Sequence, residues 1–345
     1  MGFPVSFTRF WTPCFIFRPD IFARACWRKL TRRPDRCVAK TAWDDWLDVE
    51  PHKFIGAQVY MRGVHELPVC EVLWRLAGTG ETAIDVGANI GVMTSLLSRR
   101  VGEQGCVLAF EAHPGVFLQL QQNVRRWNRS QVEAFNLAIS NRTGMVTVHE
   151  GEGFAANEGT ARVHKAGVSG RCFDSAWGYS RRQQGSTFTP VQDPFSASGQ
   201  VRALLRTGKS ARRSGTESGC AWFEVESTKL DDMLPAAGCE VLKIDVEGHE
   251  FEVLLGANSA LVARRIRDVV FESTWNFPGP AHELLLRHGY NLFGIDASLS
   301  GPTLTTVSPR SDSENRQADY LATVEPQRAK ELIALAGWKV LRRRQ

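Results

Sequence analysis

The sequence predicts an α/β protein whose core is a doubly wound, mostly parallel sheet. Short apolar runs alternate with segments in which apolar residues recur at helical spacing, which is typical of strand–helix–strand units. With 345 residues, the chain is long enough for one such domain with additions. Five runs are expected to form the core strands: TAIDV at 82–86, CVLAF at 106–110, VEAFNLAI at 132–139, EVLKI at 240–244 and DVVFE at 268–272.

The first three runs and the two segments between them predict a βαβαβ half-sheet. Helices are expected at about 92–100 and 114–127, where apolar residues gather on one face. Right-handed crossover connections would place both helices on the same face of the sheet.

The segment before the first core strand is expected to be a helical and β cap on the main domain. Residues 18–33 have the spacing of an amphipathic helix that begins at Pro19. Residues 37–62 are rich in aromatic and β-branched side chains, which predicts short antiparallel strands.

Residues 151–221 interrupt the pattern with a glycine-, serine- and arginine-rich composition and few periodic apolar positions. This composition predicts a low-complexity basic insertion that is flexible. The chain is therefore divided into four parts: a cap at 1–70, the first, cofactor-binding half of the main domain at 71–150, the insertion at 151–221, and the second half at 222–345.

The second half is expected to complete the sheet. A short helix is predicted around 230–234, two helices follow the fourth run through Leu261, and another spans 281–288. Residues 291–296 and 319–323 predict an antiparallel hairpin at the sheet edge, and a last helix is expected from Pro326 to Gly337.

Composition excludes several classes of protein. No stretch of 18 apolar residues exists, so a membrane-spanning helix is not expected. The eight cysteines include no C-x-x-C pair, which argues against zinc ribbons and redox motifs and favours free thiols in the cytoplasm. The net charge of +5 is concentrated in two segments, so no general nucleic-acid-binding surface is predicted.

Residues 1–40 carry nine Lys/Arg and two Asp/Glu. A solvated basic leader helix is the favoured interpretation. Peripheral contact with an acidic membrane surface is the alternative.

The first chemical motif is Asp85-Val86-Gly87-Ala88-Asn89-Ile90-Gly91, placed between a strand and a helix. Gly87 permits a tight turn, and Gly91 permits close packing of the helix start. The motif lacks the second glycine of G-x-G-x-x-G, and the Asp85 carboxylate suits a cationic amine, as in S-adenosylmethionine, better than a diphosphate.

A second motif supports a nucleoside cofactor. Glu111 ends the next strand, where an acidic residue accepts hydrogen bonds from both hydroxyls of a ribose. The third run ends at Asn136–Ile139, and the backbone around Ala138 is expected to meet an adenine edge.

The third motif is Lys243-Ile244-Asp245-Val246-Glu247-Gly248-His249-Glu250, at the carboxyl end of a core strand, where ligands bind in open α/β sheets. Asp245 and His249 are the candidate acid/base residues. Helix capping is favoured for Glu250, and Glu272 at the end of the following strand is a lesser candidate.

The stretches 81–123 and 230–257, with DVGANIG and IDVEGHE, resemble the FkbM family of S-adenosylmethionine-dependent methyltransferases. The resemblance implies a class I methyltransferase fold, Rossmann-like with an antiparallel C-terminal hairpin, and O-methylation of a sugar, glycan or natural-product hydroxyl. It places Asp85, Gly87, Asn89, Gly91 and Glu111 at the cofactor and Asp245 near the transferred methyl group. Ala112 stands where the family commonly has proline.

Three functional hypotheses remain at this point. The first is an O-methyltransferase in which Asp245 or His249 accepts the hydroxyl proton; a divalent cation held by Asp245, Glu247 and Glu272 is an option that the sequence does not demonstrate. The second is a nicotinamide-dependent oxidoreductase, and the third is a non-catalytic binding module on the same fold. The sequence leaves the acceptor and the oligomeric state undetermined.

Overall fold

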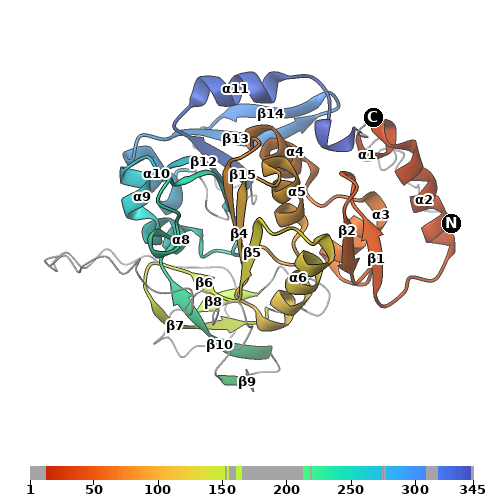
Figure 1. Ribbon diagram of the computed structural model, residues 1–345, viewed down its shortest axis with the longest axis horizontal. Helices are drawn as coiled ribbons and strands as arrows, with labels where there is room; N and C mark the ends of the chain where they lie inside the picture. The colour runs from red at the N-terminus through yellow and green to blue at the C-terminus, as the bar shows by residue number, and fades with distance from the viewer. Residues whose placement is uncertain are drawn as a thin grey trace, which may run out of the picture.

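The computed structural model describes residues 13–151, 154, 161–164, 213–217, 220–273, 275, 277–307 and 318–342 (Figure 1). Its centre is an eight-stranded sheet in the order β14-β13-β15-β12-β11-β3-β4-β5. The strand bounds are β3 Thr82–Val86, β4 Cys106–Phe110, β5 Val132–Phe135, β11 Cys239–Ile244, β12 Ile266–Ser273, β13 Asn291–Ser298, β14 Gly301–Thr306 and β15 Ala318–Thr323.

The sheet is parallel from β5 through β4, β3 and β11 to β12, and antiparallel from there to β15, β13 and β14. This is the predicted class I methyltransferase architecture. The predicted pairing of residues 291–296 with 319–323 is confirmed as β13 against β15. The sequence analysis missed β14, which pairs with the outer side of β13.

Alternate residues of the core strands face two separate apolar layers. Ala83, Val107 and Val241 pack with helices α4 (Leu67–Leu76) and α5 (Val92–Val101). Ile84, Leu108 and Leu242 pack on the other face. That face is covered by α8 (Glu250–Gly256), α9 (Asn258–Val262) and α10 (Pro280–Arg287). Because both faces are buried, the strands are continuously apolar, and polar side chains are concentrated at their ends.

The crossover helices lie where the sequence predicted them. α5 connects β3 to β4, and α6 (Pro114–Trp127) connects β4 to β5. Phe117 and Leu120 of α6 pack against Ala109, on the same face as α5. The last helix, α11 (Pro326–Ala334), ends earlier than predicted, and a 3-10 turn, η5 (Lys339–Leu341), follows it.

The N-terminal part was predicted correctly only in its first half. α1 (Pro13–Phe17) and α2 (Pro19–Leu30) precede the antiparallel pair β1 (Cys37–Lys40) and β2 (Trp46–Val49). The prediction of strands as far as residue 62 was wrong, because α3 (Phe54–Arg62) is a helix. Its buried residues Ile55, Val59 and Tyr60 follow helical spacing, and aromatic and β-branched content hid that period.

A second sheet, in the order β6-β10-β7-β8 with β9 beside β10, is inserted between β5 and β11. Its strands are β6 Ala138–Ile139, β7 Gly144–His149, β8 Arg162–His164, β9 Arg213–Glu217 and β10 Cys220–Thr228. The predicted third core strand at 132–139 is therefore two strands in two sheets. β8, β9 and the start of β10 lie within the predicted insertion at 151–221, and most of that insertion lies outside the described residues.

The proposed boundary at residue 70 falls inside α4, which packs on α5 and on α11. The Arg75 guanidinium of α4 donates hydrogen bonds to the carbonyls of Ile333 and Leu335, at 2.7 and 2.5 Å. In the part of the chain that the structure describes, no helix combines the length and apolar character needed to cross a membrane.

Candidate active site

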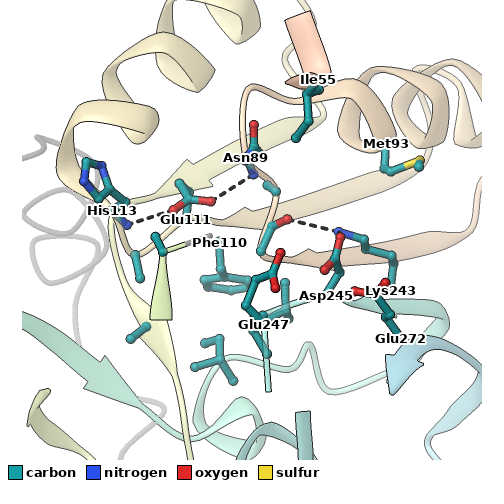
Figure 2. Close-up of a pocket in the computed structure, with 18 of the residues that line it drawn as sticks. Ile55, Asn89, Met93, Phe110, Glu111, His113, Lys243, Asp245, Glu247 and Glu272 are labelled. Atoms are coloured by element: carbon teal, nitrogen blue, oxygen red, sulfur yellow. Dashed lines mark hydrogen bonds and ion pairs between the residues drawn. The ribbon is translucent and has the colours of Figure 1, made fainter. Parts of the chain in front are cut away.

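A cavity of about 350 Å³ opens at the carboxyl ends of β3, β4 and β11 (Figure 2). Its walls come from the β3–α5 turn, the end of β4, strand β6, the turn after β11 and the start of α3. Ligands bind at this edge in open α/β sheets, and the volume lies within the usual range for small-molecule sites.

The β3–α5 turn allows two strand ends to approach closely. Gly87 has a φ of +76°, and a Cβ atom there would lie 1.8 Å from the carbonyl oxygen of Asp245. The Asp245 N–H donates a 3.0 Å hydrogen bond to the Val86 carbonyl, which joins the turn to the end of β11. No side chain larger than hydrogen fits at Gly87.

Gly91 serves helix packing rather than the cavity wall. Its φ is +94°, and a Cβ atom there would lie 2.8 Å from Leu120 and 2.9 Å from Trp127, both on α6. Gly91 is not among the residues that line the cavity, whereas Asn89 and Ala138 are.

Glu111 presents its carboxylate to the cavity from the end of β4 (Figure 2). One oxygen accepts a 2.9 Å hydrogen bond from the Asn89 N–H, and the other accepts a 2.8 Å hydrogen bond from the His113 N–H. Burial raises the pKa of Glu111 to about 7, and the two backbone donors oppose that shift. A carboxylate has about four acceptor positions, so two remain for ligand hydroxyls.

Asp85 lies behind the cavity wall and is fully buried. The Thr94 hydroxyl donates a 2.6 Å hydrogen bond to one carboxylate oxygen, and the other lies 3.5 Å from the Lys243 ammonium. The structure therefore connects Asp85 to the cavity through Lys243.

Lys243 is the cation at the centre of this site. Its ammonium donates a 3.0 Å hydrogen bond to the Gly87 carbonyl and lies 3.3 Å from the Asp245 carboxylate (Figure 2). Burial opposes its charge, but the carboxylates of Asp245 and Asp85 outweigh that penalty and raise the pKa of Lys243 above its ordinary value. Lys243 thus links the β3–α5 turn to the Asp245 carboxylate.

The other end of the cavity is acidic. The Asp245 side chain is 30% exposed and lies beside Glu247 and Glu272 (Figure 2). Burial and the neighbouring Asp245 carboxylate raise the pKa of Glu247 to about 7. Glu247 also has a left-handed backbone with φ +53°, a strained conformation that is concentrated at functional sites.

Two residues of the third motif lie elsewhere. His249 precedes α8 and does not line the cavity; its Nε2 is 2.9 Å from the Ser140 hydroxyl. The Glu250 carboxylate accepts hydrogen bonds from the N–H groups of Gly248 and Val246, so it stabilises the turn between β11 and α8; no side-chain hydrogen bond from His249 caps the helix. Of the third motif, the residues that line the cavity are Lys243, Asp245, Val246 and Glu247.

Sequence reasoning assigned no role to several polar residues of the cavity wall, among them Lys243, His65, Glu66 and His113. Lys243 left a signal, because a lysine inside an apolar core strand needs a buried partner. His65 and Glu66 left none, since they reach the wall from the link between α3 and α4. Among the described residues, no three His, Cys, Asp or Glu side chains are grouped to hold a metal ion.

Comparison with known proteins identifies the family. The Methyltransferase FkbM domain model matches residues 85–292, which is more than half of the chain. The AMB antimetabolite synthetase AmbE of Pseudomonas aeruginosa is 26% identical over an alignment of 298 residues, which covers 76% of this chain and 12% of that much longer protein.

The chain is also similar, at low identity and low TM-score, to solved methyltransferase structures. An S-adenosylmethionine-dependent O-methyltransferase of Thermotoga maritima is 12% identical, with 85% of this chain and 94% of that chain covered and a TM-score of 0.37. Fibrillarin of Aeropyrum pernix, solved with natively bound S-adenosylmethionine, is 13% identical, with 85% and 84% covered and a TM-score of 0.33.

The family match spans all three chemical motifs of the sequence, and the structure brings residues of each motif to one cavity. The chain therefore carries the catalytic domain of an S-adenosylmethionine-dependent methyltransferase and belongs to the FkbM methyltransferase family.

Proposed function

We propose that the chain transfers a methyl group from S-adenosylmethionine to a hydroxyl oxygen of a sugar, glycan or natural product. The observation that carries the proposal is the single cavity lined by Glu111 at one end and Asp245 at the other. AmbE is named as an antimetabolite synthetase, which supports a small natural product among the acceptor classes.

The residues present fit the cofactor. The Glu111 carboxylate is oriented by two backbone N–H groups, and its remaining acceptor positions suit the two hydroxyls of a ribose. Phe110, Leu137 and Ala138 give the adjoining wall the apolar character that an adenine ring requires. When bound, S-adenosylmethionine supplies an electrophilic methyl group on a sulfonium.

The chain's own residues would act mainly by positioning. Alignment of two bound reactants removes about 7–11 kcal/mol of an activation barrier. A positioned base adds about 10²–10⁴-fold. We assign that base to Asp245, whose carboxylate is open to the cavity and would accept the hydroxyl proton on an Oδ atom. The Lys243 ammonium keeps that carboxylate in place.

Glu247 is the neighbour that supports Asp245. Because its pKa is about 7, part of the Glu247 population is protonated at neutral pH. A protonated carboxyl donates a hydrogen bond to an acceptor oxygen, and an ionised one accepts one. Both forms suit a substrate that carries several hydroxyls.

Calorimetric titration with S-adenosylhomocysteine tests the cofactor site. We expect micromolar binding, and about 10–100-fold weaker binding by the Glu111→Ala variant, which loses hydrogen bonds to a charged group.

Because the pKa of Glu111 is about 7, its carboxylate is ionised above that pH and accepts hydrogen bonds from the ribose hydroxyls. Affinity is therefore expected to fall as the pH is lowered below about 7, by about tenfold per unit.

Two control variants test whether the Glu111 carboxylate causes this pH dependence of the affinity. Glu111→Gln, which cannot ionise, should bind S-adenosylhomocysteine weakly at every pH, whereas Glu247→Gln should keep the pH dependence of the parent protein.

A folded protein that binds NADH and not S-adenosylhomocysteine would favour the oxidoreductase hypothesis, and one that binds neither would favour the non-catalytic module. With binding established, release of S-adenosylhomocysteine in the presence of polyhydroxylated acceptors, and an oxygen-bound methyl in the product, would test the acceptor class.

A further inference from the structure

Helix α2 presents an apolar face to solvent on the side opposite its packed face. Trp27 is 69% exposed and Leu30 is 84% exposed, and Phe22 and Cys26 are exposed beside them. At 100° per residue, these four side chains fall within one sector of about 140°. Exposed apolar side chains that cluster on one face, rather than being scattered singly, mark an interaction surface.

The opposite face holds α2 firmly to the rest of the protein. Ile21 and Ala25 are buried, and α2 packs on α3. The Arg28 guanidinium lies 3.9 Å from the centre of the Tyr60 ring and donates a hydrogen bond to the Tyr60 carbonyl. Figure 1 shows α2 at the periphery of the molecule beside α3, far from α9 and α10. The exposed sector is therefore presented on a fixed helix at the protein's edge.

The charge of α2 and the residues that follow it indicates the kind of partner. Residues 18–36 contain seven Lys/Arg and two Asp, a net charge of +5. Two of these arginines are held against the protein, since Arg18 is buried beside Asp20 and Arg28 packs on Tyr60. Arg32 and Arg33, immediately after the helix, are exposed. A helix with Trp, Phe and Leu on one face and basic residues around them is typical of helices that lie in the interface of an anionic bilayer.

We propose that α2 binds the surface of anionic phospholipid membranes, with Trp27 and Leu30 inserted at the headgroup boundary and the exposed Arg32 and Arg33 side chains facing the headgroups. α3, which supports α2, contributes Phe54 and Ile55 to the cavity wall, so docking through α2 would hold the cavity close to the membrane surface. The proposal is independent of the methyl-transfer chemistry, and its test does not depend on finding the acceptor.

Co-sedimentation of the full chain with vesicles tests the proposal. We expect binding to vesicles that contain phosphatidylglycerol and little binding to vesicles of phosphatidylcholine alone. Trp27→Glu/Leu30→Glu should lower partitioning at least about tenfold, because both apolar contacts are lost and two negative charges are added. Arg32→Gln/Arg33→Gln should lower binding and its dependence on phosphatidylglycerol, and so should salt of about 1 M, where the Debye length is about 3 Å.

Val262→Glu/Leu286→Glu is the matched control, since those side chains are 61% and 44% exposed on α9 and α10, away from α2. It should bind vesicles like the parent protein. Circular dichroism and S-adenosylhomocysteine affinity should be unchanged in all three double variants, which excludes misfolding as the cause. Equal binding to both vesicle types, or no binding to either, would overturn the proposal. A dimer that Trp27→Glu/Leu30→Glu dissociates in sedimentation velocity, without vesicle binding, would assign the surface to a second copy of the chain.

Discussion

Replacing Asp245 with alanine is expected to lower turnover by about 10²–10⁴-fold, the usual contribution of a positioned general base. The Asp245 carboxylate lies at the cavity end opposite the carboxylate assigned to the ribose, so it would act on the acceptor rather than hold the cofactor. Affinity for S-adenosylhomocysteine should therefore stay nearly unchanged. Steady-state turnover beside calorimetric titration measures both effects.

A second carboxylate of the cavity serves as a control. It separates the loss of the proton acceptor from the loss of any one negative charge in the cavity. Glu272 lines the same cavity from β12 (Figure 2), and Glu272→Gln should cost much less turnover than Asp245→Ala. Asp245→Asn, which keeps the size of the side chain but is no base, should resemble Asp245→Ala. A turnover rate unchanged by both Asp245 substitutions would remove Asp245 from the chemistry and leave Glu247 as the carboxylate to test.

The centre of the sheet was predictable from the sequence because both of its faces are buried. Each core strand had to be continuously apolar, so the acidic residues at strand ends, Asp85, Glu111 and Asp245, were conspicuous in the sequence. The tight turn at Gly87 could be inferred locally, but its cause could not. The Asp245 carbonyl that excludes a side chain there follows the end of β11, more than 150 residues away in the sequence.

The parts that failed depend on contacts between distant segments. α3 has the composition of a strand, and packing against α2 and the β1–β2 pair stabilises it as a helix. β9, with the sequence RSGTE, has no apolar period and is defined by its backbone pairing with β10. His65 and Glu66 reach the cavity only because the N-terminal elements fold against the sheet. No periodicity in the sequence carries such information.

Lys243 is the residue for which strand order matters most. In the ladder between β11 and β3, Lys243 pairs directly with Asp85, and only this register places the ammonium beside the buried carboxylate. Replacing Lys243 with methionine leaves Asp85 fully buried without its cation. We expect the free energy of unfolding to fall by about 3–5 kcal/mol, as when one member of a buried ion pair is removed. Urea denaturation measures the loss.

Two further variants test the cause of that loss. Lys53→Met removes a partly exposed pair with Glu50 and should cost at most about 1 kcal/mol. Adding Asp85→Asn to Lys243→Met removes the uncompensated charge and should restore much of the stability, giving a coupling energy of the size expected for contacting residues, about 0.5–3 kcal/mol. If Lys243→Met were as stable as Lys53→Met, the ion pair between Lys243 and Asp85 would contribute nothing to the stability of the fold.

The double variant also isolates the hydrogen bond from Lys243 to the Gly87 carbonyl, which Asp85→Asn cannot replace. A restored fold that still binds S-adenosylhomocysteine weakly would assign Lys243 to the positioning of the cofactor turn as well as to the stability of the sheet.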